Sequence, residues 1–219
     1  MALLAPLEIK VWGDFACFTR PENKVERVSY PVMTPSAACG ILESVFWKPE
    51  FQWRVEEIAV LRPIQYFSIL RNEVNSRQSV RSARNWMNGG GGYIATADRA
   101  QRHSLILRDV GYIIRAQIEV RPEVGDDPAK FRDQFRRRVK RGQCFTMPYL
   151  GNREFSASFA APDGSEQAIA ASGELGRMLL DIDYHPDGSG RGTPKFFSAL
   201  LEEGVLRIPH SPVIGNARA

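Results

Sequence analysis

Histidine is the residue best suited to general acid–base chemistry in this 219-residue chain, because its unperturbed pKa lies near neutrality. His103 directly follows Arg102 and precedes Arg108 by five positions, whereas His185 and His210 each adjoin a proline. A histidine beside arginines can take the proton from a ribose 2′-hydroxyl, while a cation stabilises the charge that develops on the attacked phosphate. The sequence has no zinc-like His/Cys spacing, no paired-carboxylate signature and no nucleophilic-serine motif. These residues favour metal-independent RNA cleavage that needs no cofactor and leaves a 2′,3′-cyclic phosphate.

Positive charge is concentrated in two regions of a nearly balanced chain. There are 29 Lys and Arg against 25 Asp and Glu, which gives a net charge of +4. Residues 71–108 contain seven arginines and two acids, and residues 132–141 contain five arginines and one lysine against one acid. Two such clusters favour a polyanionic partner. The candidate phosphate contacts in the basic loops and clusters are Arg20, Lys24, Arg27, Arg77, Arg81, Arg108, Arg136, Arg137, Lys140 and Arg191.

Two amphipathic helices are expected. The first begins at Thr34 and Pro35, a capping hydroxyl followed by a proline that suits the first turn, and it closes before Pro49. The second begins at the acids and proline of residues 126–128 and ends at Gly142. Apolar residues at helical spacing predict the buried faces: Ala38, Ile41, Leu42, Val45 and Phe46 in the first helix, and Phe131, Phe135 and Val139 in the second.

Strand-like segments surround these helices, and we expect strands over residues 7–12, 55–61, 64–70, 104–121 and 145–150. Together with the helices they give the order β-α-β-β-α-β, which is typical of a ferredoxin-like or RRM-like α+β fold. Later strands, over 155–160, 175–184 and 205–208, predict a small C-terminal β-sheet extension. The chain is therefore divided into an RRM-like domain at 1–150 and a β-rich extension at 151–219.

A basic, Gly-rich insertion at about 71–103 interrupts the first domain. It shows no sustained hydrophobic period and contains four consecutive glycines at 89–92. A stretch of this length without periodicity is usually a functional loop. We interpret it as a basic flap without regular secondary structure, in which Trp86 and Tyr93 can stack on unpaired bases.

The composition argues against a membrane or secreted protein. No apolar run approaches the ~20 residues that a membrane span requires, and the first residues lack the basic segment and long apolar core of a secretory signal. The three cysteines, Cys17, Cys39 and Cys144, are too widely spaced for a disulfide framework or a metal site and fit a reducing cytosol. We therefore expect a cytoplasmic location.

Several long runs carry a family resemblance. They are GDFACFTRPE, KVERVSYPVMTPSAACGILESVFWKPEF, RPIQYFSILRNEVNSRQ, QRHSLILRDVGYIIRAQIEV and MPYLGNREFSASF, and the resemblance spans roughly residues 7–210. The runs resemble the CRISPR-associated subtype I-C (Dvulg) RAMP family of precursor-CRISPR-RNA endoribonucleases. The resemblance implies a RAMP fold, cleavage at the base of the repeat hairpin and retention of the 5′ handle of the crRNA. The implied partners are the CRISPR repeat RNA and the backbone and large subunits of the type I-C surveillance complex.

The same resemblance implies a catalytic set of one tyrosine on the first helix and an adjacent lysine–histidine pair. The histidine corresponds to His103, the lysine to Arg102 and the tyrosine to Phe46, so two of the three positions depart from the family pattern. Arginine keeps the positive charge but is a poor acid. Phenylalanine can neither donate nor accept a proton.

These departures leave two alternatives open, and the two basic regions add a third. Tyr30 or Tyr66 can replace the missing hydroxyl, with Lys48 supplying charge near the first helix, or cleavage is slow. Alternatively, cleavage is lost and the protein is a non-catalytic RNA/DNA-binding subunit. The third alternative is general nucleic-acid binding that includes duplex DNA, which steep salt dependence with little sequence preference would reveal.

Overall fold

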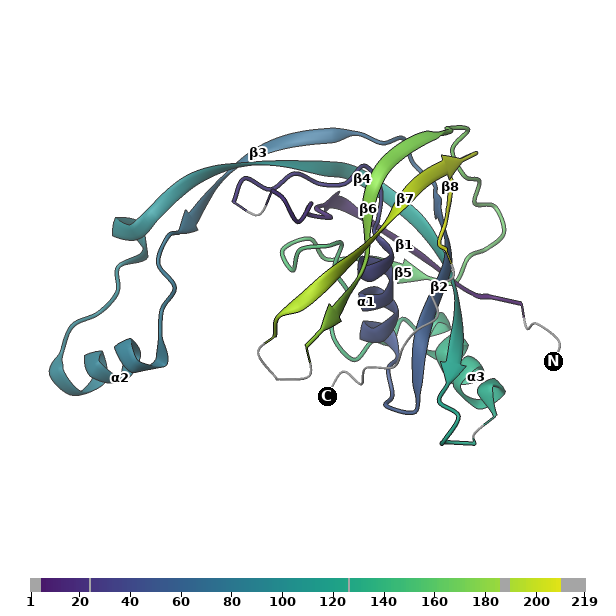
Figure 1. Ribbon diagram of the computed structural model, residues 1–219, viewed down its shortest axis with the longest axis horizontal. Coiled ribbons are helices and arrows are strands. Elements are labelled where there is room, and N and C mark those ends of the chain that lie inside the picture. Colours follow the sequence, from purple (N-terminus) through teal and green to yellow (C-terminus); the bar gives the residue numbers. More distant parts are fainter. Residues whose placement is uncertain (1–4, 24, 126, 186–189, 210–219) are drawn as a thin grey trace.

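Eight strands form one curled antiparallel sheet that dominates the fold (Figure 1). The computed structural model describes residues 5–23, 25–125, 127–185 and 190–209. The sheet follows the order β5 (Ser158–Ala160), β1 (Leu7–Ala16), β4 (Arg99–Val120), β2 (Phe51–Val60), β8 (Val205–Arg207), β7 (Gly192–Glu202) and β6 (Gly173–Tyr184). β3 (Tyr66–Val74) pairs with β4 outside this path. Each neighbouring pair whose register is resolved is antiparallel. The predicted α+β class is confirmed.

Two helices pack on this sheet and complete its core. α1 (Pro35–Val45) is capped by the Thr34 hydroxyl, which accepts a hydrogen bond from the Ala37 amide at 3.3 Å. α3 (Pro128–Lys140) is capped by the Asp127 carboxylate, which accepts from the Ala129 amide at 2.9 Å. All eight residues of the predicted apolar faces are buried, so both helix predictions are confirmed. In the part of the chain that the structure describes, no helix has the length and apolarity to cross a membrane.

An aromatic cluster ties the two helices to β2. The Phe51 ring centroid lies 5.3 Å from that of Phe46 and 5.2 Å from that of Phe131. Trp53 lies 4.7 Å from Phe135, and its indole N–H donates to the Phe46 carbonyl at 2.9 Å. Each aromatic pair adds about 0.5–1.5 kcal/mol beyond the area that it buries, so the cluster stabilises the C-terminal end of α1.

The predicted structureless flap is wrong, because this segment is built from regular elements. β3 pairs along its full length with the first part of β4, and α2 (Val80–Gly89) and the 3₁₀ turn η1 (Ala95–Asp98) cap the hairpin. We call residues 66–107 the arm, which projects from the body of the molecule (Figure 1). Trp86 and Tyr93 stack on each other there, with ring centroids 6.3 Å apart. No residue of β3 or α2 is buried, so the hydrophobic patterns of packed elements are missing from the sequence.

In the C-terminal third, one strand prediction is wrong and one strand was not predicted. Residues 145–150 form no strand, since Tyr149 makes only an isolated bridge with Ser156. β7 was not predicted, because Gly192 and Pro194 at its start are typical of a turn. The strands expected at 175–184 and 205–208 are confirmed as β6 and β8. β8 pairs with β2, so these strands continue the main sheet, and a domain boundary at residue 150 stays a prediction.

Candidate functional site

Phe46, the position of the family tyrosine, is a core residue. Its side chain is 2% exposed, and the Arg138 guanidinium lies 5.6 Å from its ring centroid. Arg138 also donates to the Val45 carbonyl at 2.7 Å, which satisfies one of the unpaired carbonyls at the end of α1. Lys48, two residues further on, is half-buried. Position 46 therefore supplies packing and carries no hydroxyl.

Arg102 and His103 lie on the arm, in the first part of β4. They are consecutive in a strand, so their side chains point to opposite faces. His103 is exposed and lies opposite Leu70, whereas Arg102 is half-buried opposite Arg71. Arg102 also lies 3.6 Å from the Glu73 carboxylate. This arrangement does not present both side chains to one phosphate.

The three residues of the expected catalytic set are not brought together. Phe46 packs on Phe51, which pairs with Val120 at the opposite end of β4 from His103. A strand rises about 3.3 Å per residue, so the stretch from His103 to Val120 runs on the order of 50 Å along β4. Figure 1 shows β4 running from the arm to the base of the body. His103 and Phe46 therefore share no site in this structure.

Tyr66 is the better placed of the two alternative hydroxyls. Tyr30 is buried, and burial raises its pKa. Tyr66 is 44% exposed, and desolvation raises its pKa as well, which keeps the hydroxyl protonated at neutral pH. It pairs with Leu107, four residues from His103 along β4, so both side chains lie on one face of the arm roughly 13 Å apart. That face therefore carries one imidazole and one proton donor.

Five charged residues form a cluster along the arm, where the loop after β1 and the segment before β5 reach it. Glu73 lies 3.3–3.6 Å from Arg27, Arg71 and Arg102. Glu154 pairs with Arg27 at 3.2 Å and also with Arg71. Arg27, a predicted RNA contact, is thus held by two carboxylates and links the loop after β1 to the arm. Ion pairs between distant segments leave no local sequence pattern, so the two acids were not predicted from sequence.

Exposed cations occur on two elements. Arg77 and Arg81 lie on the outer arm and make no ion pair within the described chain. On α3, Arg136 pairs with Asp133 at 3.1 Å, and the neighbouring Arg137 and Lys140 are exposed. The arm and α3 therefore present separate positive surfaces.

The other candidate cations are scattered. The Arg20 guanidinium lies 4.5 Å from the centroid of the Tyr30 ring. Arg108 is exposed and donates to the Gln65 side chain at 2.9 Å, and Arg191 is exposed in the connection between β6 and β7. Two residues singled out in the sequence, Lys24 and His210, lie outside the described residues.

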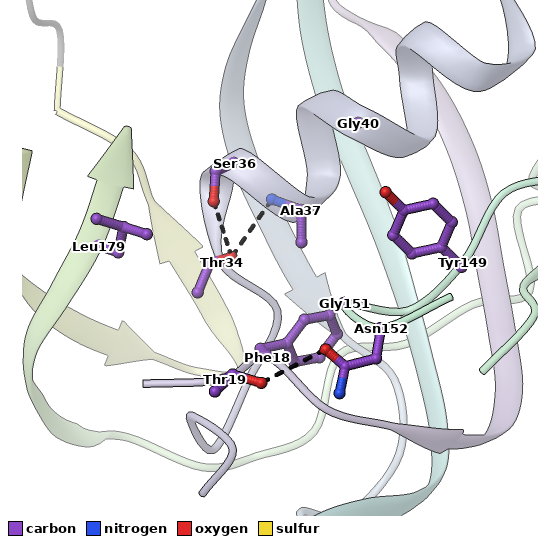
Figure 2. A pocket seen from close by; sticks show the side chains of 10 residues that line it. All are labelled: Phe18, Thr19, Thr34, Ser36, Ala37, Gly40, Tyr149, Gly151, Asn152 and Leu179. Carbon is purple, nitrogen blue, oxygen red and sulfur yellow. Dashed lines mark hydrogen bonds between the residues drawn. The ribbon is translucent and has the colours of Figure 1, made fainter. Parts of the chain in front are cut away.

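A cavity of about 270 Å³ lies beside α1 (Figure 2). Its walls come from the start of α1, from the segments after β1 and before β5, and from β6. Its polar side chains are those of Thr19, Thr34, Ser36, Tyr149 and Asn152. Single polar residues from separate segments form no motif, which is why sequence reasoning does not find this cavity.

Gly151 shapes the loop that carries Tyr149 and Asn152. Its φ is +84°, and a Cβ at this position would lie 2.1 Å from the Cys17 carbonyl oxygen. Only glycine can adopt this backbone so close to its neighbour. The Cys17 amide donates to the Leu150 carbonyl at 3.0 Å, which fixes the loop against the end of β1. The glycine of the run MPYLGNREFSASF is the one signal in the sequence that points to this wall.

The chain is similar to several known proteins. The family model Cas_Cas5d, CRISPR-associated protein (Cas_Cas5), matches residues 6–209. A curated relative from Thermus thermophilus, named CRISPR pre-crRNA endoribonuclease Cas5d, is 44% identical over 221 residues, covering 94% of this chain and 92% of the relative. A crystal structure of a CRISPR-associated protein has a TM-score of 0.66 at 22% identity, covering 94% of this chain and 92% of that one. A chain of a CRISPR RNA-guided surveillance complex has a TM-score of 0.51 at 12% identity, covering 98% of this chain and 95% of that one.

Proposed function

This chain belongs to the Cas5d family of CRISPR-associated proteins, and we propose that it is an endoribonuclease that cleaves precursor CRISPR RNA at the repeat hairpin and retains the 5′ handle. One observation carries the proposal: 44% identity, over 94% of the chain, to a relative named for cleavage of this precursor. Identity at that level over nearly the whole chain supports a shared substrate class.

The proposed RNA-binding core is a ferredoxin-like unit made of β5, β1, β4 and β2. The strand order β5-β1-β4-β2 supports this arrangement, as do the helix between β1 and β2 and the helix between β4 and β5. The exposed cations of α3, within this unit, and of the arm, which projects from it, supply phosphate contacts at two separate places. RNA that spans both would be held at two points.

His103 is the proposed general base, because it is exposed and shares a face of the arm with Tyr66. His103 accepts the proton of a ribose 2′-hydroxyl, whose oxygen attacks the adjacent phosphorus, and an acid protonates the leaving 5′-oxygen. The products are a 2′,3′-cyclic phosphate and a 5′-hydroxyl. Tyr66 donates a hydrogen bond to the bound RNA. Arg108 follows Leu107 in β4 and therefore points to the opposite face, where it is exposed and contacts a flanking phosphate. The proton lost from the 2′-hydroxyl is matched by the proton gained by the 5′-oxygen, and an imidazole and a proton donor carry out these transfers, so the proposed cleavage needs no metal.

A second candidate function is favoured by the burial of Phe46. If the family tyrosine acts from this position, its loss leaves a subunit that binds the RNA but does not cut it. A Phe46→Tyr variant that cleaves repeat RNA, beside a wild-type protein that only binds it, would support this second function.

The proposed partners are the repeat RNA and the backbone and large subunits of a type I-C surveillance complex. This part of the proposal is motivated by the fold shared with a chain of a CRISPR RNA-guided surveillance complex. General binding of duplex DNA is the remaining alternative, and binding with steep salt dependence but no preference for the repeat would favour it.

The test is incubation of the purified protein with its own repeat RNA in EDTA. We expect a single cut that leaves a 2′,3′-cyclic phosphate, and His103→Ala should slow this cut by a factor of about 100 to 10,000, the usual contribution of a general base. His185→Ala is the matched control, because His185 is also exposed but lies on the connection between β6 and β7. We expect this variant to cleave at the wild-type rate.

Each other outcome has a definite meaning. Cleavage by the His103→Ala variant at the wild-type rate would show that His103 is not the general base, while the protein would still be an endoribonuclease. Cleavage that appears only when magnesium is restored would contradict the metal-independent mechanism. Tight binding with no product would favour the non-catalytic subunit.

A further inference from the structure

A fixed but exposed apolar segment follows α3. Phe145 and Met147 are 83% and 67% exposed. The backbone at this point is nevertheless bonded to the last turn of α1: the Phe145 amide donates to the Ser44 carbonyl at 2.7 Å, and the Thr146 amide donates to the same oxygen at 3.2 Å. Phe145 is therefore held in one place by the fold while most of its ring faces solvent.

Further exposed aromatic residues lie along α1. Trp47, in the connection after α1, is at the same end of the helix as Phe145. Tyr149 is also exposed, and it lines the cavity together with Gly40 in the middle of α1 (Figure 2). We call the four exposed side chains that follow α1 in this way the apolar strip: Trp47, Phe145, Met147 and Tyr149. Single exposed apolar residues are common, but a row of them on a fixed backbone indicates an interaction surface.

Exposed cations lie at the Phe145 end of the apolar strip. The chain turns at Gly142, whose φ is +63°, and the Gln143 amide donates to the Arg138 carbonyl at 2.9 Å. Phe145 thus comes directly after the end of α3. A partner that contacts Phe145 therefore meets positive charge on its α3 side. The exposed charged side chains at the end of α3 are all cationic: Arg137, Lys140 and Arg141.

The acids near the apolar strip do not cancel this charge. Residues 142–149 contain no acid. Asp133, earlier in α3, pairs with Arg136 at 3.1 Å, and Glu43 and Glu50, before and after the end of α1, are half-buried. At the Tyr149 end the charge is mixed, because an arginine and a glutamate follow at 153 and 154. The positive charge therefore belongs to the Phe145 end.

Exposed rings beside cations suit single-stranded RNA. Its unpaired bases stack on aromatic side chains, and its phosphates bind lysine and arginine. The proposed function already brings RNA phosphates to α3, next to Phe145. These observations favour RNA over an acidic protein surface as the partner of the apolar strip.

We propose that the apolar strip binds unpaired nucleotides of the precursor RNA, with Phe145 as the principal stacking residue, an inference that rests on the proposed function. One base stacks on the exposed Phe145 ring, and the phosphates on either side of it bind Arg137 and Lys140. Trp47 contacts a neighbouring base. Phe145 lies at the end of α1, far from His103, so the strip contributes to RNA affinity and not to the cleavage step.

Fluorescence anisotropy of the full-length protein with its repeat RNA tests the role of Phe145. Phe145→Ala should weaken binding about 5- to 150-fold, the range expected for the loss of one stacked base. Phe145→Trp should bind like wild type, because a larger ring still stacks, whereas Phe145→Leu should lose most of the same affinity. Leu200→Ala is the matched control and should bind like wild type, because Leu200 is also an exposed apolar residue but lies on β7.

An abasic scan identifies the stacked base. Each unpaired nucleotide of the repeat is made abasic in turn, and one position should weaken wild-type binding about as much as Phe145→Ala does. The same abasic change should cost the Phe145→Ala variant nothing further, because the ring and the base act as one pair. In cleavage assays KM should rise in this variant while kcat stays at the wild-type value.

Salt titration and thermal unfolding separate the ring from charge and from misfolding. Phe145→Ala removes no charge and buries little, so the slope of log K against log salt and the melting temperature should both match wild type. Arg137→Ala with Lys140→Ala should instead lower that slope by about 1.4.

The remaining outcomes contradict the proposal. Equal RNA affinity of Phe145→Ala and wild type would overturn the stacking role and leave the proposed function intact. A further loss of affinity in the Phe145→Ala variant at every abasic position would overturn it as well. A variant that keeps its RNA but loses a protein subunit would assign the apolar strip to a protein partner, and wild type that binds no repeat RNA would overturn the proposed function too.

Discussion

At the scale of single residues, position 46 shows how one side chain separates packing from chemistry. The spacing of Phe46 from Ala38 and Leu42 correctly predicts a buried residue, and the family resemblance assigns a catalytic tyrosine to the same position. A phenylalanine can fill the buried position but cannot transfer a proton. Sequence reasoning could therefore predict that this residue is buried. It could not find Glu73 and Glu154, the ion-pair partners of Arg27, because contacts between distant segments have no periodicity.

Replacing Phe46 should affect stability more than RNA binding. Phe46→Ala removes a ring that contacts Phe51 and Arg138 in the core, so we expect a loss of about 3–5 kcal/mol in the free energy of unfolding. Urea denaturation measures this loss. The neighbouring Trp47 is 49% exposed, and Trp47→Ala should cost less than half as much. A stable Phe46→Ala protein that no longer cleaves RNA would instead place this residue in the reaction.

At the scale of elements, the arm marks the limit of prediction from patterns. The sequence locates a basic, glycine-rich insertion at about 71–103 but not its strands or helix. Periodicity arises when one face of an element is buried, and β3 and α2 bury no residue. α1 and α3, which bury a full apolar face, begin at the predicted residues, and all the predicted apolar residues are buried, although Arg132, expected on the basic face of α3, is buried as well.

The arm should contribute electrostatic binding without contributing stability. We expect the double variant Arg77→Ala with Arg81→Ala to lower the slope of log K against log salt by about 1.4, or 0.7 for each lost contact with single-stranded RNA. Its melting temperature should match wild type, because both side chains are exposed and unpaired within the described chain. Arg207→Ala is the control, since Arg207 is exposed on β8 and pairs with Glu57 and Glu202. An unchanged salt slope in the double variant would show that the arm does not contact phosphates.

At the scale of the whole molecule, one sheet and one core cross the predicted domain boundary. Met178, Leu201 and Leu206 of the C-terminal strands belong to the same buried cluster as Ile41 of α1. The sequence predicts the strands β6 and β8 but not that β8 pairs with β2, because strand pairing between distant segments depends on the packed structure. The α+β class could be predicted, whereas the continuity of the sheet could not.

This continuity predicts one unfolding transition. Calorimetry of the full-length protein should show a single peak whose calorimetric and van't Hoff enthalpies agree, and residues 1–150 alone should show no cooperative transition. The fragment lacks the strands that cover part of the shared core. Two separate peaks, or a fragment that melts cooperatively, would support an independent domain that ends at residue 150.

β4 belongs to both the body and the arm, with mechanical consequences. Leu107 pairs with Tyr66 in the arm and also with Ala16 of β1 in the body. Further out, Leu105 exchanges backbone hydrogen bonds with Arg27 and Ser29, and Glu73 pairs with Arg27. The loop after β1 therefore supports the first half of the arm from the side. A load on the outer end of the arm is carried into the sheet by β4 and by this loop together, so the arm resists bending at its base.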